Sequence, residues 1–167
     1  MKRTLTAMTA MFALAAPALA QQPVMIGEIA FGPDLLEKAD EYGERELGYL
    51  ARHTRESLER ELGAQLGQGG YTLQVTILDA TPNRPTMEQM ADRPGLSNRS
   101  ISIGGARLEG VLYAPGGEVV ESYEYAWRSH NIEQVLGYGQ WTDARRAITR
   151  FADDVGEGVA LVNQSGM

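Results

Sequence analysis

The chain has 167 residues, with 15 lysines and arginines, 22 aspartates and glutamates, and no cysteine. The lack of cysteine excludes disulfides, thiolate metal sites, cysteine nucleophiles and the lipid-modified cysteine of a lipoprotein. The net charge of −7 argues against nucleic acid and anionic lipid surfaces as partners, because like charges repel one another.

Residues 1–20 are predicted to form a cleavable signal peptide. Lys2 and Arg3 precede a short apolar run, and Ala18-Leu19-Ala20 matches the small-x-small cleavage pattern. The apolar run is shorter than the roughly 20 residues that span a bilayer, so we expect no permanent membrane anchor. Cleavage removes two of the 15 basic residues and leaves 13 against 22 acidic ones, a net charge of about −9. We expect residues 21–167 to be one exported domain in a bacterial periplasm, with secretion as the alternative.

The first half of this domain is predicted to be a strand, a long helix and a second strand. Residues 24–31 are apolar and rich in β-branched side chains, and Gly32-Pro33 ends the strand. Apolar residues then recur every three or four positions over residues 34–66, which is typical of a helix with one buried face. The glycines of residues 67–70 end this helix. Residues 71–79 alternate between apolar and polar side chains, as a half-buried strand does.

Two segments of the second half lack a regular apolar pattern. Residues 80–97 carry three prolines, and residues 129–141 carry apolar and aromatic side chains next to glycines. Loops of this length in a compact domain are typical of functional or mobile segments. We therefore expect binding residues to concentrate in these two loops.

The remaining segments of the second half complete the fold. Residues 99–114 and 118–128 are predicted strands, and Pro115-Gly116-Gly117 joins them into a hairpin. Thr142 is expected to begin a final helix, whose apolar stripe extends to Val162. The order of elements is then β-α-β-β-β-α. It predicts an α+β fold of two layers, in which two helices cover one face of a mostly antiparallel four-stranded sheet.

Common catalytic and metal-binding motifs are missing from the sequence. No Gly-x-Ser-x-Gly, phosphate-binding or calcium-binding loop occurs, and the two histidines show no ligand spacing, so we predict neither a metal nor a cofactor. His53 lies one helical turn before Glu56, which is typical of a solvated ion pair. His130 follows the hairpin and is the only candidate general base. A periplasmic hydrolase that uses His130 with carboxylates of residues 80–97 is therefore one alternative function.

Four loop residues are the predicted binding residues: Tyr138, Trp141, Arg84 and His130. Tyr138 and Trp141 are the expected anchors, because large amphipathic side chains dominate recognition, and Arg84 is expected nearby. The alternative is that Trp141 is structural and locks the start of the last helix against the hairpin. Its expected partners there are three aromatic residues on one face, Tyr123, Tyr125 and Trp127.

A resemblance to a known group of proteins rests on the later part of the chain. Residues 102–112, the hairpin after them and the segment from Trp141 to Val155 resemble uncharacterised proteobacterial envelope proteins, many of them lipoproteins. These proteins share a small α+β fold with auxiliary proteins of envelope transporters. The resemblance implies an accessory role and no catalytic residue. The missing acylated cysteine departs from the lipoprotein members and argues against tethering to the outer membrane.

We therefore predict an exported periplasmic protein with a non-catalytic binding or accessory role in the cell envelope. Its expected partner is an envelope protein or a small ligand. A second alternative, beside the hydrolase, is a structural subunit that assembles through the long helix at residues 34–66. The oligomeric state does not follow from the sequence.

Overall fold

The computed structural model describes residues 22–165, and the predicted signal peptide at residues 1–20 lies outside them. The main elements are four strands and two long helices: β1 (Val24–Phe31), β2 (Tyr71–Thr81), β3 (Gly105–Tyr113), β4 (Val119–Arg128), α3 (Glu44–Leu62) and α5 (Thr142–Ser165). Shorter helical segments lie between them: α1 (Pro33–Leu36), α2 (Ala39–Tyr42), η1 (Gly63–Gln65), α4 (Met87–Asp92) and η2 (Ile132–Val135).

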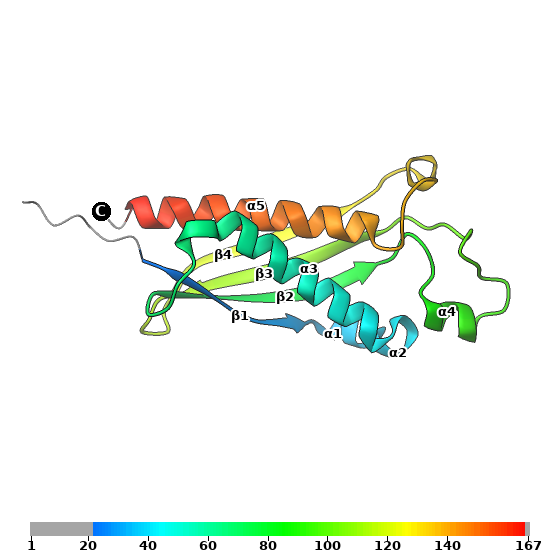
Figure 1. Ribbon diagram of the computed structural model, residues 1–167, viewed down its shortest axis with the longest axis horizontal. Helices are drawn as coiled ribbons and strands as arrows, with labels where there is room; N and C mark the ends of the chain where they lie inside the picture. The colour runs from blue at the N-terminus through cyan, green and yellow to red at the C-terminus, as the bar shows by residue number, and fades with distance from the viewer. Residues whose placement is uncertain (1–21, 166–167) are drawn as a thin grey trace, which may run out of the picture.

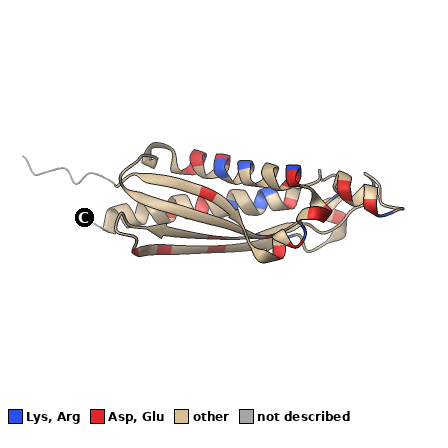
Figure 2. Ribbon diagram, turned by 90° about the horizontal axis from the view of Figure 1, so that it is seen from below, with Lys and Arg blue, Asp and Glu red and all other residues tan. Residues whose placement is uncertain are grey.

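The four strands form one sheet in the order β1-β2-β3-β4. β1 is parallel to β2, and the other two neighbouring pairs are antiparallel. α3 and α5 pack against each other over one face of this sheet, which gives the molecule two layers (Figures 1 and 2). The predicted α+β fold is confirmed, including the mostly antiparallel sheet and the two helices on one face.

The hydrophobic core lies between the sheet and the two long helices. Strand alternation turns every second side chain of β2 and β3 toward the helices, and an apolar stripe of α5 meets them. The largest fully buried side chains of these elements are Leu73, Ile77, Leu108, Leu112, Ile148 and Phe151. Gly110 of β3 makes room for the bulkiest of them, because a Cβ there would lie 2.9 Å from the Phe151 ring.

The helix predicted at residues 34–66 is not continuous. It is divided into α1, α2, α3 and η1. Gly43 joins α2 to α3 with a φ of 90°, a conformation that other residues rarely adopt. A Cβ at Gly43 would also lie 2.6 Å from a carboxylate oxygen of Glu88. The break leaves α1 packed on β2 and α2 packed on α4, while α3 covers the sheet.

The predicted loop at residues 80–97 is shorter than expected. β2 continues to Thr81, and α4 begins after a capping box in which Thr86 and Gln89 bind each other's backbone N–H groups. The strand predicted from residue 99 begins only at Gly105. Residues before it bind the preceding loop instead, since the Ser102 N–H donates to the Asn83 carbonyl at 2.9 Å.

Candidate functional site

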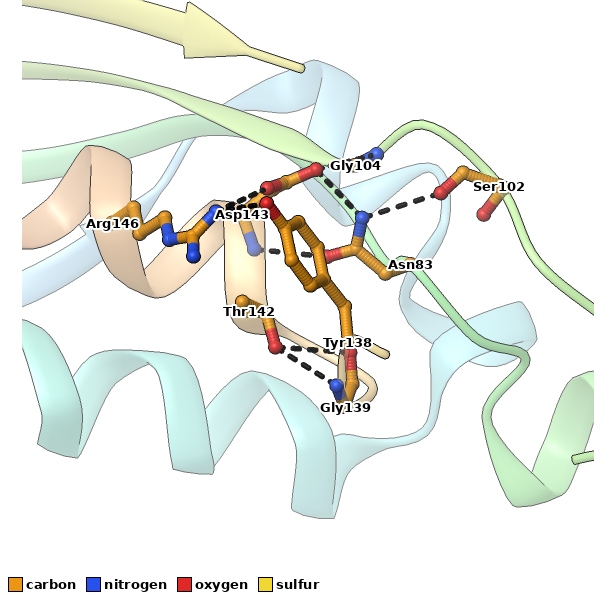
Figure 3. A network of polar contacts seen from close by, with 8 residues as sticks. All are labelled: Asn83, Ser102, Gly104, Tyr138, Gly139, Thr142, Asp143 and Arg146. Atoms are coloured by element: carbon orange, nitrogen blue, oxygen red, sulfur yellow. Dashed lines mark hydrogen bonds and ion pairs between the residues drawn. The ribbon is translucent and has the colours of Figure 1, made fainter. Parts of the chain in front are cut away.

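A buried polar network joins the two long loops to the first turn of α5 (Figure 3). Asn83 and Asp143, at its centre, are both fully buried. The Asn83 Nδ2 donates to the Asp143 carboxylate at 2.6 Å, and the Asp143 N–H donates back to the Asn83 Oδ1 at 2.8 Å. Nδ2 also donates to the Ser102 carbonyl at 3.2 Å, and the Gly104 N–H donates to the carboxylate at 3.3 Å. These bonds tie the first long loop and the residues before β3 to α5. The Asn83 N–H donates to the Gln140 carbonyl at 2.6 Å and so ties in the second long loop.

Arg146 compensates the buried charge of Asp143. Its Nη1 lies 3.7 Å from the Asp143 Oδ1, an oxygen that accepts no hydrogen bond among the residues described. Asp143 also lies in the first turn of α5, where the positive end of the helix dipole favours a carboxylate. The Asp143 carboxylate thus makes its polar contacts inside the protein, and its role is to stabilise the fold.

Arg84 and Tyr138 lie together, as the sequence predicts. The Arg84 guanidinium donates to three backbone carbonyls, those of Tyr138 at 2.6 Å, Leu136 at 2.9 Å and Asn98 at 2.7 Å. The Tyr138 ring packs under the Arg146 guanidinium, 4.4 Å from the ring centroid, and its hydroxyl accepts a hydrogen bond from Arg146 (Figure 3). Arg84 therefore holds the loops to each other. The binding roles of Arg84 and Tyr138 remain predictions.

Trp141 is in the core, with only 4% of its surface exposed. Its Nε1 donates to the Glu46 Oε2 at 2.8 Å, and its ring meets the Tyr42 ring edge-on at a centroid distance of 5.6 Å. The expectation of an exposed anchor is therefore corrected, because the indole finds both its apolar and its polar partner inside the molecule. The structural alternative also needs correction, since these partners belong to α2 and α3 and not to the hairpin.

His130 is exposed and borders a half-open hollow of about 510 Å³ at the ends of β2, β3 and β4. We call this the His130 hollow; it is lined by Asp79, Thr81, Gly105, Ala106, Arg107, Ala126, Trp127, Arg128 and His130. Arg107 of β3 pairs with Asp79 of β2 on one side and with Ala126 of β4 on the other. They alternate with core residues, so the hollow opens on the sheet face opposite the helices. None of the other three predicted binding residues lines it.

A second hollow, of about 480 Å³, lies between α3 and α5. We call this the arginine hollow; it is lined by His53, Thr142, Arg145, Arg146, Thr149, Arg150 and Asp153. His53 is half-buried, and its Nε2 is shielded from solvent without a hydrogen-bond partner among the described residues. The predicted solvated ion pair with Glu56 is therefore wrong. Burial, and after it the Arg145 guanidinium, lower the pKa of His53 below its usual value.

Sequence reasoning missed both the Asn83–Asp143 pair and the arginine hollow. A signal for the hollow was present, because Arg146 and Arg150 are four residues apart and therefore share one face of the predicted helix. No comparable signal marks Asn83. Its partner lies 60 residues further along the chain, and only the folded arrangement of the loops brings the two together.

Two further observations concern membrane-spanning helices and metal ligands among the described residues. Among residues 22–165, no helix is both long enough and apolar enough to cross a membrane. In the same part of the chain, no three acidic or histidine side chains are grouped so that they could hold a metal ion.

No family model and no curated protein matches the sequence. Two solved structures resemble the fold. A candidate lipoprotein from Caulobacter crescentus CB15 has 16% identity and a TM-score of 0.43, over 89% of this chain and 94% of that one. A minor lipoprotein from Acinetobacter baumannii has 14% identity and a TM-score of 0.32, over 84% of this chain and 94% of that one. Both similar structures are described as bacterial lipoproteins, and neither likeness assigns this chain a ligand, a partner or a site residue.

Proposed function

We propose that the protein is exported to the cell envelope and binds a small ligand in the His130 hollow without changing it chemically. The observation that supports this role best is that the walls of the hollow are fixed by the buried network. Gly105 lines the hollow and follows Gly104, whose N–H donates to Asp143. The Ser129 N–H donates to the Gly104 carbonyl at 3.3 Å, directly before His130. A hollow formed in advance loses little conformational freedom on binding.

The lining of the hollow suits a small ligand with hydrogen-bond acceptors. Gly105 and Ala126 are small, so they leave space above the strands. Arg107 and Arg128 lie on either side and offer guanidinium donors. Arg107 is already paired with Asp34 at 3.1 Å, whereas Arg128 has no acidic partner among the described residues. Arg128 is therefore the side chain that we expect to contribute most to binding.

The carboxylates that the hydrolase alternative needs, Glu88 and Asp92 of residues 80–97, do not line the hollow with His130, which favours binding. Asp79 is the one carboxylate that lines the hollow together with His130. Its Oδ1 accepts hydrogen bonds from the Lys38 ammonium at 2.6 Å and from the Ala80 N–H at 2.8 Å. No hydrogen bond joins Asp79 to His130 among the described residues, so this carboxylate does not orient the imidazole as a general base either.

Equilibrium dialysis tests the proposed function. The protein without its predicted signal peptide (the processed protein, residues 21–167) is dialysed against the small-molecule fraction of a bacterial periplasm. Retained compounds are identified by mass spectrometry. We expect a compound that the wild type retains unchanged, that Arg128→Gln retains about tenfold less, and that the exposed control Arg99→Gln retains like the wild type. Turnover of a compound by the wild type but not by His130→Ala would contradict the proposal and support the hydrolase.

A further inference from the structure

The arginine hollow concentrates positive charge on an acidic protein. Arg145, Arg146 and Arg150 line it, and Asp153 is the one acidic side chain in its lining. Arg146 is paired with Asp143, but Arg145 and Arg150 have no carboxylate partner within residues 22–165. Arginines four residues apart on one helix, such as Arg146 and Arg150, repel each other. An anion in the hollow would relieve this repulsion.

Two of the guanidinium groups are held in place by aromatic rings. Arg146 lies over the Tyr138 ring and Arg150 lies over the Trp127 ring, 4.8 Å from its centroid. Stacking of this kind restricts a long side chain that would otherwise lose much freedom on binding. The same hollow contains the hydroxyl groups of Thr142 and Thr149. The guanidinium and hydroxyl donors thus lie along about three turns of α5, and the rings hold two of the guanidinium groups in place.

His53 supplies a polar group on the α3 side of the hollow. Its Nε2 is shielded from solvent and has no hydrogen-bond partner in the described part of the chain. The ring lines the hollow beside Arg145, so its signals report on an anion that binds there. The charged groups around the ring are Arg145, Glu56 and Arg60, and the Tyr49 ring stacks on it at a centroid distance of 6.3 Å.

We propose that the arginine hollow binds a phosphate group. A guanidinium group can bind two phosphate oxygens at once, and an anionic group with several acceptor oxygens suits a site with arginines, hydroxyls and an imidazole around it. The net charge of the chain is −7, which disfavours long polyanions, so the phosphate is carried by a small solute or by a single headgroup. This site is separate from the His130 hollow and does not depend on the function proposed for it.

Histidine-ring NMR tests this site directly, because the chain has two histidines and one lines each hollow. Sodium phosphate is titrated into the processed protein at constant ionic strength. We expect a saturable shift of the His53 signals while the His130 signals stay in place. Arg145→Gln and Arg150→Gln should each weaken phosphate binding about tenfold, whereas Arg99→Gln, which removes one charge from an exposed loop, should change it less than about twofold.

Vesicles distinguish the two sources of the phosphate. Co-sedimentation with phosphatidylglycerol vesicles that Arg145→Gln abolishes would identify a lipid headgroup. Phosphate binding without co-sedimentation would identify a soluble phosphate compound. The proposal is overturned if phosphate leaves the His53 signals in place and vesicles do not co-sediment the protein. It is also overturned if chloride shifts the signals as strongly as phosphate, or if Arg99→Gln weakens binding as much as Arg145→Gln.

Discussion

Trp141 is held from two sides inside the molecule, by the Tyr42 ring and by the Glu46 carboxylate. We expect Trp141→Ala to lower the free energy of unfolding by about 3–5 kcal/mol, because it opens a cavity and leaves the Glu46 Oε2 without its donor. Trp141→Phe keeps most of the packing and should cost clearly less. Urea unfolding of the three proteins gives the comparison. An unchanged midpoint for Trp141→Ala would show that the indole is not part of the core.

Asn83 is the second residue whose removal should destabilise the fold. Among the described residues, Asn83→Ala leaves the buried Asp143 carboxylate with two polar contacts, the Gly104 N–H and the more distant Arg146 guanidinium. We expect a loss of at least about 2 kcal/mol in the free energy of unfolding, since a buried charged acceptor loses its closest donor. Asn98→Ala is the matched control, because Asn98 is exposed. Equal urea midpoints for the two variants would contradict the structural role of the Asn83–Asp143 pair.

The lowered pKa of His53 makes stability depend on pH. The unfolded chain has a histidine pKa of about 6.5 and takes up its proton first as the pH falls. The contribution of His53 to the free energy of unfolding is therefore fully present above about pH 6.5. It declines as the pH falls toward the lower folded-state pKa. His53→Gln should flatten this decline. Unfolding midpoints at neutral and mildly acidic pH measure it, and an equal decline in wild type and variant would refute the assignment.

Gly158 controls how closely α5 approaches β4. In an ordinary helix interior, alanine is more stable than glycine by about 1 kcal/mol. Here a Cβ would lie 2.7 Å from the Tyr123 hydroxyl oxygen, so we expect Gly158→Ala to destabilise the fold by about 1–3 kcal/mol. Combining it with Tyr123→Leu should remove most of this cost. The four proteins of this double-mutant cycle are compared by thermal unfolding, and simple additivity would rule out the contact.

The fold was largely predictable at the level of elements, and the reasons are local. The strand alternation of residues 71–79 and the apolar stripe after Thr142 each predict one element directly. The interruption at Gly43 was not predictable, because a glycine at a regular apolar spacing fits an unbroken helix equally well. Its positive φ depends on the way α2 packs against α4. α4 was missed because a six-residue helix is too short to show a period.

The candidate site was less predictable, because its parts meet only in the folded chain. Arg84 was expected near Tyr138 and lies there, but whether either residue binds a ligand remains a prediction. Whether Trp141 faces outward depends on Glu46, which lies 95 residues earlier and looks like any exposed helix acid in the sequence. The burial of such a side chain follows from tertiary contacts and not from local pattern.

At the scale of the whole molecule, the export of the protein is the first expectation to test. The predicted signal peptide should be removed after Ala20, so that the protein in a periplasmic extract begins at Gln21. Its intact mass should match residues 21–167 without a lipid. A mass that includes residues 1–20, or fractionation with membranes after a high-salt wash, would contradict export as a free periplasmic protein.

The central claim is that a small ligand binds in the His130 hollow and is released without chemical change. NMR signals of the His130 ring test this claim most directly. The processed protein is titrated with the compound that dialysis retains, and the same sample is analysed by mass spectrometry. We predict a saturable shift of the His130 signals, about tenfold weaker binding in Arg128→Gln, and a compound of unaltered mass. Unshifted His130 signals in the wild type, or a compound converted by the wild type and not by His130→Ala, would contradict the account.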